Sequence, residues 1–208
     1  MDSIILASHS PRRREILEKV GIPYLLFGVE IEERIRERRN RLSSNVRSSV
    51  IGNAGRKADA AREHFSNGLV LGVDTVVFFN GRVLGKPADR LEASRFLRML
   101  SGNWHSVYSG ITVRDARGNG SCSACSVTRV RFARMSQGEI DAYVGLGEWE
   151  GKAGGYAVQG EAALYIDRIE GSYHNIMGLP LEELFRILKK FGYFGSGGRF
   201  EPVRKPGT

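Results

Sequence analysis

Three consecutive arginines near the N-terminus are the first residues of this sequence that could act on an anion. Arg12, Arg13 and Arg14 follow Ser10 and Pro11, which suit the N-cap and the first position of a helix. The first turn of a helix carries partial positive charge, so three cations there oppose the helix unless an anion binds. Free N–H groups beside guanidinium groups bind phosphate. We therefore predict a phosphate site here, in preference to a solvated basic helix end.

Asp74 is a second candidate, because it lies inside Leu69–Phe79, the most apolar run of the chain. An ionised carboxylate in such surroundings needs hydrogen bonds, an opposite charge or a metal ion. Lys86 follows after a turn, and Glu32 and Glu33 offer further oxygen ligands. A phosphate-directed Mg²⁺ site needs only one or two carboxylates. The alternative is a structural aspartate that is hydrogen-bonded to the backbone.

Strands and helices alternate along the chain and position these residues. Ile4–Ala7 is expected to be a buried strand, and the residues after Pro11 an amphipathic helix. Leu69–Phe79 is expected to be a central strand that turns back at Asn80-Gly81 in a type I′ hairpin. Further strands are predicted at 24–29, 105–113, 121–132 and 162–169, and further helices at 50–63, 89–102, 136–144 and 180–192. We predict an exposed segment at 34–47 and a loop at 171–175.

This alternation predicts an α/β fold with a mixed, twisted sheet and flanking helices. We expect one catalytic domain over residues 1–194, followed by a disordered basic tail at 195–208. The chain contains 31 Lys and Arg against 23 Asp and Glu, a net charge of +8, which favours anionic partners. No apolar run approaches a membrane span and no secretory signal is recognisable, so a cytoplasmic location and no membrane partner are expected.

Several other chemistries are disfavoured by residue spacing. Cys122 and Cys125 form one C-x-x-C without a second pair of ligands, in a stretch typical of a strand, which speaks against zinc or redox chemistry. Residues 81–87 have the wrong length and the wrong final residue for a P-loop. Ser8 and Ser10 lack a recognisable His and Asp partnership for a hydrolase triad.

Six motifs in register resemble the Maf-like nucleoside triphosphate pyrophosphatases. They are LASHSPRRREIL at 6–17, GVDTVV at 72–77, LGKP at 84–87, LSGNWHSVYSG at 100–110, KAGGYAVQG at 152–160 and GSYHNIMGLP at 171–180. The resemblance implies two lobes around a central cleft, in a Maf/ITPase-like fold. It also implies metal-dependent hydrolysis of nucleoside triphosphates to monophosphate and pyrophosphate, with Mg²⁺ or Mn²⁺ as the cofactor.

The same motifs imply roles for single residues. The resemblance implies that Ser8, Arg12, Arg13 and Lys57 bind phosphate. It implies that Asp74, Glu33 and Lys86 form the reacting centre and that Asp74 and Glu33 hold the metal. It also implies that Gln159 and Lys152 determine substrate specificity. Whether Asp74 is a metal ligand or the general base stays open at this point. The form of the motif around Gln159 resembles the branch that acts on dTTP and UTP.

The alternatives are the 7-methyl-GTP branch of the same family, a basic nucleic-acid-binding protein and a division-regulating protein without turnover. A nucleic-acid module is expected to interleave aromatic residues with basic ones, and residues 34–47 contain none. The expected partner is therefore the nucleoside triphosphate rather than nucleic acid. Whether the chain forms a homodimer stays open.

Overall fold

The computed structural model describes residues 3–31, 43–118 and 120–195. Along the chain these form β1 (Ile4–Ala7), α1 (Pro11–Lys19), β2 (Tyr24–Leu26), α2 (Ser43–Arg62), β3 (Leu69–Phe79), β4 (Arg82–Leu84), α3 (Arg90–Leu100), β5 (Trp104–Asp115), β6 (Ser121–Phe132), α4 (Gln137–Gly145), η1 (Ala153–Gly155), η2 (Glu161–Tyr165), β7 (Ile166–Glu170), α5 (Tyr173–Met177) and α6 (Leu181–Lys190). No helix in these ranges is long and apolar enough to cross a bilayer.

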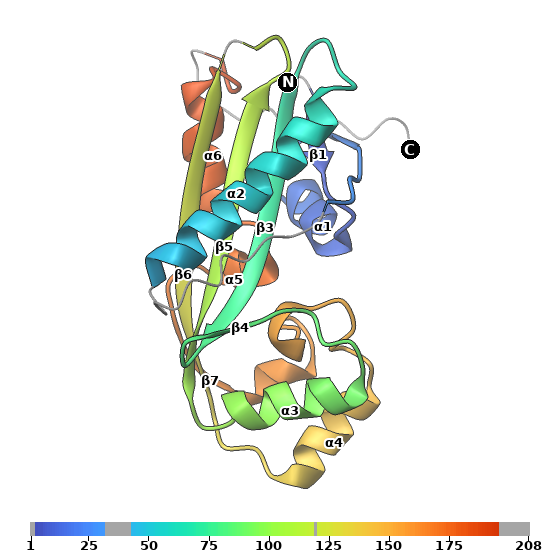
Figure 1. The fold of residues 1–208 in the computed structure, drawn as a ribbon, viewed down its shortest axis with the longest axis vertical. Helices are drawn as coiled ribbons and strands as arrows, with labels where there is room; N and C mark the ends of the chain where they lie inside the picture. Colours follow the sequence, from blue (N-terminus) through green and yellow to red (C-terminus); the bar gives the residue numbers. More distant parts are fainter. Residues whose placement is uncertain (1–2, 32–42, 119, 196–208) are drawn as a thin grey trace.

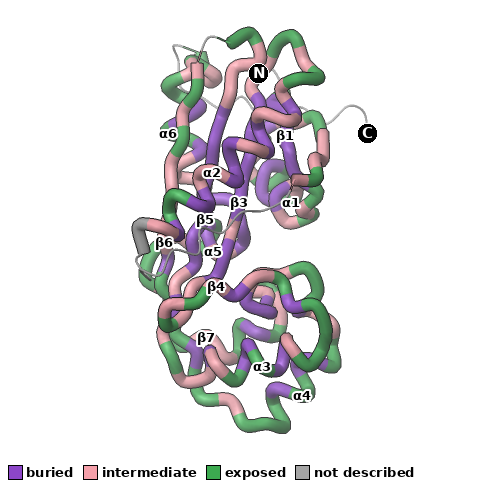
Figure 2. The backbone as a smooth tube through the Cα atoms, in the orientation of Figure 1, coloured by how far each residue is buried: buried purple, intermediate pink, exposed green. Residues whose placement is uncertain are grey.

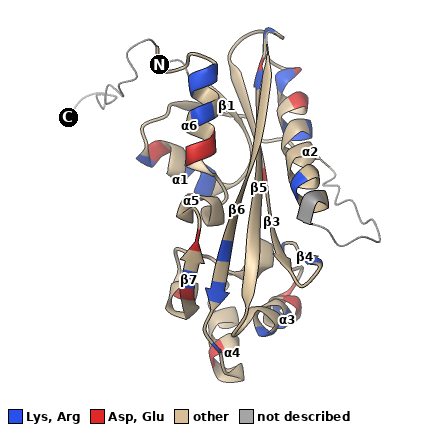
Figure 3. Ribbon diagram, turned by 90° about the vertical axis from the view of Figure 1, so that its left-hand side faces the viewer, with Lys and Arg blue, Asp and Glu red and all other residues tan. Residues whose placement is uncertain are grey.

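One seven-stranded sheet organises the molecule, in the order β2-β1-β3-β5-β6-β7, with β4 paired to β3. Strand β1 is parallel to both β2 and β3, and every other pairing is antiparallel. Helix α2 covers one face of the sheet and α1, α5 and α6 the other (Figure 3). The predicted α/β fold with a mixed sheet is therefore confirmed.

The long strands β3, β5 and β6 extend beyond the layer of helices and connect two lobes (Figure 1). We call the part with β1, α1, α2, α5 and α6 the sheet lobe, and the part with α3, α4, η1 and η2 the helical lobe. One continuous apolar core joins them, from Ile4 and Leu188 to Phe96 and Tyr143. Buried backbone follows the central strands and enters both lobes (Figure 2). The division into a domain at 1–194 and a tail stays a prediction, because 196–208 lie outside the described residues.

Two glycines allow helix α2 to lie unusually close to the sheet. A Cβ atom at Gly72 would overlap the Ala54 carbonyl, and one at Gly110 would overlap the Val50 backbone. Close approach of two backbones is a use to which only glycine is suited. The glycines therefore let one face of α2 reach β3 near Asp74.

Most predicted elements are confirmed, several with their bounds, but four predictions need correction. The predicted strand 24–29 ends at Leu26, and the predicted strand 162–169 begins as the 3₁₀ helix η2. The predicted loop 171–175 contains the start of α5, which Ser172 caps by accepting the Asn175 N–H at 3.3 Å. A five-residue helix is too short for its periodicity to show in sequence.

The fourth correction concerns the segment 34–47. Residues 34–42 lie outside the described ranges, whereas 43–47 belong to α2, which starts seven residues before the predicted 50–63 helix. Val46 and Val50, four residues apart, are both buried beside Tyr108. The many polar residues around these two valines hid the helical period.

The core of the helical lobe contains a buried histidine that should make stability depend on pH. His105 is 3% exposed, its Nε2 lies 2.8 Å from the Tyr156 hydroxyl, and its ring packs edge-on against Phe132. Burial lowers the pKa of His105 from 6.5 to about 4. The folded protein therefore keeps this ring neutral at a pH where the unfolded chain is already protonated.

We expect the contribution of His105 to stability to be fully present above pH 6.5 and to fall as the pH drops toward 4. Between these values the unfolded state binds the extra proton, so the loss reaches about 3 kcal/mol. Urea unfolding of the wild type and of His105→Gln at several pH values measures this loss. It is the pH-dependent difference between the free energies of unfolding of the two proteins. Parallel curves would contradict the prediction, and the exposed His64→Gln is the control.

Candidate active site

A cleft of about 980 Å³ lies between the two lobes. Its walls come from the β1–α1 turn, the middle of β3, the segment after β4, residues 148–160 and the end of α5. The sequence-predicted residues that line it are Ser8, Arg12, Arg13, Lys57, Asp74, Lys86, Lys152 and Gln159. Glu33, the remaining predicted residue, lies outside the described residues. Residues from distant parts of the sequence thus meet in one hollow.

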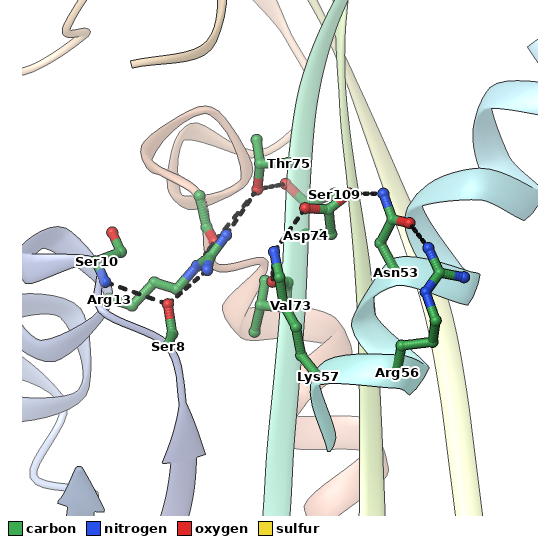
Figure 4. Close-up of polar contacts among 11 residues, drawn as sticks. Ser8, Ser10, Arg13, Asn53, Arg56, Lys57, Val73, Asp74, Thr75 and Ser109 are labelled. Carbon is green, nitrogen blue, oxygen red and sulfur yellow. Dashed lines mark hydrogen bonds and ion pairs between the residues drawn. The ribbon is translucent and has the colours of Figure 1, made fainter. Parts of the chain in front are cut away.

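Arg13 ties the β1–α1 turn to the rest of the sheet lobe (Figure 4). Its side chain is buried and donates from Nη1 to the Ser8 hydroxyl at 2.7 Å and from Nε to the Gly178 carbonyl at 2.9 Å. Its Nη2 also lies 3.4 Å from the Thr75 hydroxyl oxygen. The guanidinium group is therefore fixed in place rather than solvated, at the start of the helix where an anion was predicted.

Ser10 and Pro11 begin α1 as predicted, but Ser10 does not cap the helix with its side chain. The Ser10 N–H instead donates to the Ser8 hydroxyl at 3.2 Å. The first turn of α1 contains no acidic residue. Partial positive charge and the arginine side chains therefore combine at this edge of the cleft.

Asp74 is held from the α2 side by two donors (Figure 4). Lys57 Nζ donates to Oδ1 at 2.9 Å and Asn53 Nδ2 to Oδ2 at 2.7 Å, and Asp74 is only 2% exposed. Asn53 in turn accepts a hydrogen bond from Arg56. This network fixes the orientation of the carboxylate in the wall of the cleft.

Asn53 is a residue that sequence reasoning missed. Its side chain is as buried as that of Asp74. A usable indication was present, because Asn53 and Lys57 are four residues apart and so share a helix face. A polar pair on the face that otherwise carries Ala54 and Ala58 indicates a buried polar partner on another element.

Arg12 and Lys152 bring positive charge to the cleft from opposite lobes. Burial lowers the pKa of Arg12, and no residue in the described ranges accepts a hydrogen bond from its buried Nε. Burial and then the charge of Arg12 lower the pKa of Lys152, whose Nζ donates to the Glu150 carbonyl at 2.9 Å. Two partly desolvated cations near each other favour the binding of an anion between them.

Lys86 and Gln159 occupy the exposed part of the cleft wall. Lys86 follows the β3–β4 hairpin, whose Asn80 and Gly81 have φ of 44° and 78°, as the predicted type I′ turn requires. The Gly154 N–H donates to the Gly85 carbonyl at 2.9 Å. The segment that carries Lys86 is thus joined to the segment that leads to Gln159.

The hydrogen bonds made by the Asp74 carboxylate are compatible with the binding of a divalent metal ion by the same carboxylate. Each carboxylate oxygen of Asp74 accepts one hydrogen bond, from Asn53 or from Lys57, and retains a lone pair. Mg²⁺ commonly uses one or two carboxylates and completes its shell with water and phosphate oxygens. Within the ranges that the structure describes, no group of three or more His, Cys, Asp or Glu is placed to hold a metal without such additional ligands.

Comparison with known proteins identifies close relatives over almost the whole chain. The profile of the family described as Maf-like protein matches residues 3–191. The dTTP/UTP pyrophosphatase of Pelotomaculum thermopropionicum is 47% identical over 193 residues, which cover 93% of this chain and 98% of that protein. The dTTP/UTP pyrophosphatase of Symbiobacterium thermophilum is 42% identical over 193 residues, 93% of this chain and 96% of that protein.

A solved structure of more distant sequence gives a weaker likeness. The nucleoside-triphosphatase, also titled dITP/XTP pyrophosphatase, of Mycobacterium abscessus has a TM-score of 0.39 and 16% identity over 64% of this chain and 76% of that chain. This likeness is too low to support a conclusion about fold or activity. The close sequence relatives therefore give the information about function.

Proposed function

The chain belongs to the Maf-like protein family, and on this premise we propose that it hydrolyses dTTP and UTP to nucleoside monophosphate and pyrophosphate. The name dTTP/UTP pyrophosphatase belongs to relatives that are 39–47% identical over more than nine-tenths of this chain. The observation that carries the proposal is the cleft itself, where fixed and desolvated cations face a buried carboxylate. Such a pocket suits a triphosphate.

The phosphate chain would be bound by the cations of both lobes. Arg13 and Ser8 are already linked at the start of α1, where backbone N–H groups add partial positive charge. Arg12, Lys57 and Lys86 would take up the charge that accumulates on the leaving pyrophosphate. Phosphoryl transfer depends mostly on positioning and on such charge neutralisation.

Asp74 would orient the water that attacks the α-phosphorus. Its carboxylate faces the cleft and cannot rotate freely, because Asn53 and Lys57 each hold one oxygen. An oriented carboxylate can accept a proton from the attacking water while the bond to pyrophosphate breaks. In this position Asp74 can serve either as the general base or as a metal ligand, the two roles that the sequence does not separate.

Asp74 and Glu33 would hold a divalent metal, Mg²⁺ or Mn²⁺. When bound, such an ion would neutralise phosphate charge and lower the pKa of a coordinated water. Gln159 and Lys152 would contact the nucleoside end of the substrate, on the helical-lobe side of the cleft. The cytoplasmic location, the single-domain boundaries and the homodimer remain predictions.

Hydrolysis in ¹⁸O-labelled water with Mg²⁺ tests the proposed reaction. We expect UTP and dTTP to give pyrophosphate and a nucleoside monophosphate, with the label in the monophosphate because water attacks the α-phosphorus. Label in the pyrophosphate would place the attack on the β-phosphorus instead. Absence of turnover for a panel of triphosphates that includes 7-methyl-GTP, from a folded sample with Mg²⁺ or Mn²⁺, would refute the proposal.

A further inference from the structure

Glu148 lines the cleft but has no part in the phosphate chemistry described above. It lies in the segment between α4 and η1, and its Oε2 accepts the Glu161 N–H at 3.0 Å. The carboxylate also packs against the backbone of Gly160, where a Cβ atom would overlap it. The backbone of residues 160–161 therefore holds this side chain, and Gln159, the preceding residue, lines the same cleft.

The surroundings of Glu148 hold its carboxylate in place. The Tyr143 hydroxyl accepts the Ala157 N–H at 3.0 Å, and burial, followed by the negative charge and the hydrogen bond of the neighbouring Glu148 carboxylate, raises the pKa of this phenol. Lys152 also feels the negative charge of Glu148. A carboxylate can accept about four hydrogen bonds, so the contacts with Glu161 and Tyr143 leave capacity for a donor in the cleft.

The pyrimidine bases differ at the position that a carboxylate can distinguish. Uracil and thymine present an N3–H donor between two carbonyl oxygens, whereas neutral cytosine presents a bare N3 that accepts hydrogen bonds. A fixed carboxylate attracts the first arrangement and repels the second. The amide of Gln159 and the ammonium group of Lys152 can donate to carbonyl oxygens, and both line the cleft near Glu148.

We propose that Glu148 recognises the substrate base by accepting a hydrogen bond from N3–H, and so selects uracil and thymine nucleotides over cytosine nucleotides. This inference rests on the proposed function, because it concerns the base of the same substrate. It adds a specificity residue that the sequence motifs did not indicate. A site built to bind an N–H group rejects analogues that lack it by large factors, because the acceptor in the site then faces a group that cannot donate to it.

The Glu148→Gln variant tests this role against a merely structural one. Glutamine keeps an oxygen for the Glu161 N–H but loses the charge, and its amide can donate to cytosine N3. We expect kcat/KM for UTP to fall by roughly 10- to 100-fold and the UTP-to-CTP preference to fall by at least about tenfold. Glu161→Gln, which removes an exposed carboxylate nearby, should leave both values unchanged.

An equal loss for UTP and CTP in Glu148→Gln would overturn the inference, because a structural defect affects both substrates alike. Wild-type protein gives a second test without any substitution, by comparison of UTP with N3-methyl-UTP. We expect the methylated nucleotide to be hydrolysed at least about 100-fold less efficiently. Equal hydrolysis of both would overturn base recognition while the proposed function stands, whereas no hydrolysis of UTP at all would refute the proposed function itself.

Discussion

Replacement of Asp74 by asparagine is expected to reduce kcat for pyrophosphate release by about 10³-fold. The carboxamide keeps the shape of the side chain but can neither accept the proton of the attacking water nor hold a divalent ion well. Rates with saturating UTP and Mg²⁺ measure the loss, and circular dichroism checks the fold. Near-normal turnover by a folded Asp74→Asn protein would remove Asp74 from the reacting centre.

The stability of Asp74→Asn should also fall, for a reason visible in the hydrogen bonds. Asp74 accepts from Lys57 and from Asn53, whereas a carboxamide has only one oxygen to offer. One of the two buried donors must then face an N–H₂ group. We expect a loss of about 3 kcal/mol in the free energy of unfolding.

Two further variants separate the loss of activity in Asp74→Asn from its loss of stability. In Asn53→Ala the carboxylate and its charge remain but one of its two donors is gone, so a loss in kcat of only about tenfold is expected. In the double variant Lys57→Met, Asp74→Asn the buried ammonium group is gone as well, so part of the lost stability should return while activity stays absent. Recovery of activity in the double variant would mean that the pair serves stability rather than catalysis.

The parts of the site that could be predicted from sequence are those in which one local pattern fixes both structure and chemistry. The apolar run Leu69–Phe79 gives β3 with its bounds, and the only carboxylate in it is the one that faces the cleft. Ser10 and Pro11 start α1 where the arginines follow. In both places the same few residues indicate the secondary structure and the group that can bind the substrate.

What the sequence could not provide is the pairing of distant elements. Asn53 contacts Asp74 because Gly72 and Gly110 leave room for α2 to pack close against the sheet. In the sequence, a glycine inside a strand does not reveal which element packs against it. Likewise Glu148 gains its importance from the turn at Gly160, which neither periodicity nor charge pattern reveals. The family resemblance located most of the cleft residues because it supplied tertiary information that local patterns lack.

Arg13 is expected to be the most sensitive of the phosphate-binding residues, because it joins three elements of the sheet lobe. Its guanidinium group contacts Ser8 in the β1–α1 turn, Thr75 from β3 and the carbonyl of Gly178 after α5. Lysine can supply the charge but not the planar fork that reaches these groups together. We expect kcat/KM for UTP to fall about 10²-fold in Arg13→Lys and about 10³-fold in Arg13→Ala.

Arg14→Ala is the matched control, because Arg14 is the neighbouring arginine of the same helix turn but does not line the cleft. Loss of net charge alone would reduce activity equally in Arg14→Ala and Arg13→Ala, with an effect that disappears at high salt. The fixed geometry of Arg13 requires instead that its variants stay impaired at all salt concentrations while Arg14→Ala stays close to wild type. Equal, salt-dependent losses would show that the cleft attracts the triphosphate through overall charge rather than through a placed guanidinium group.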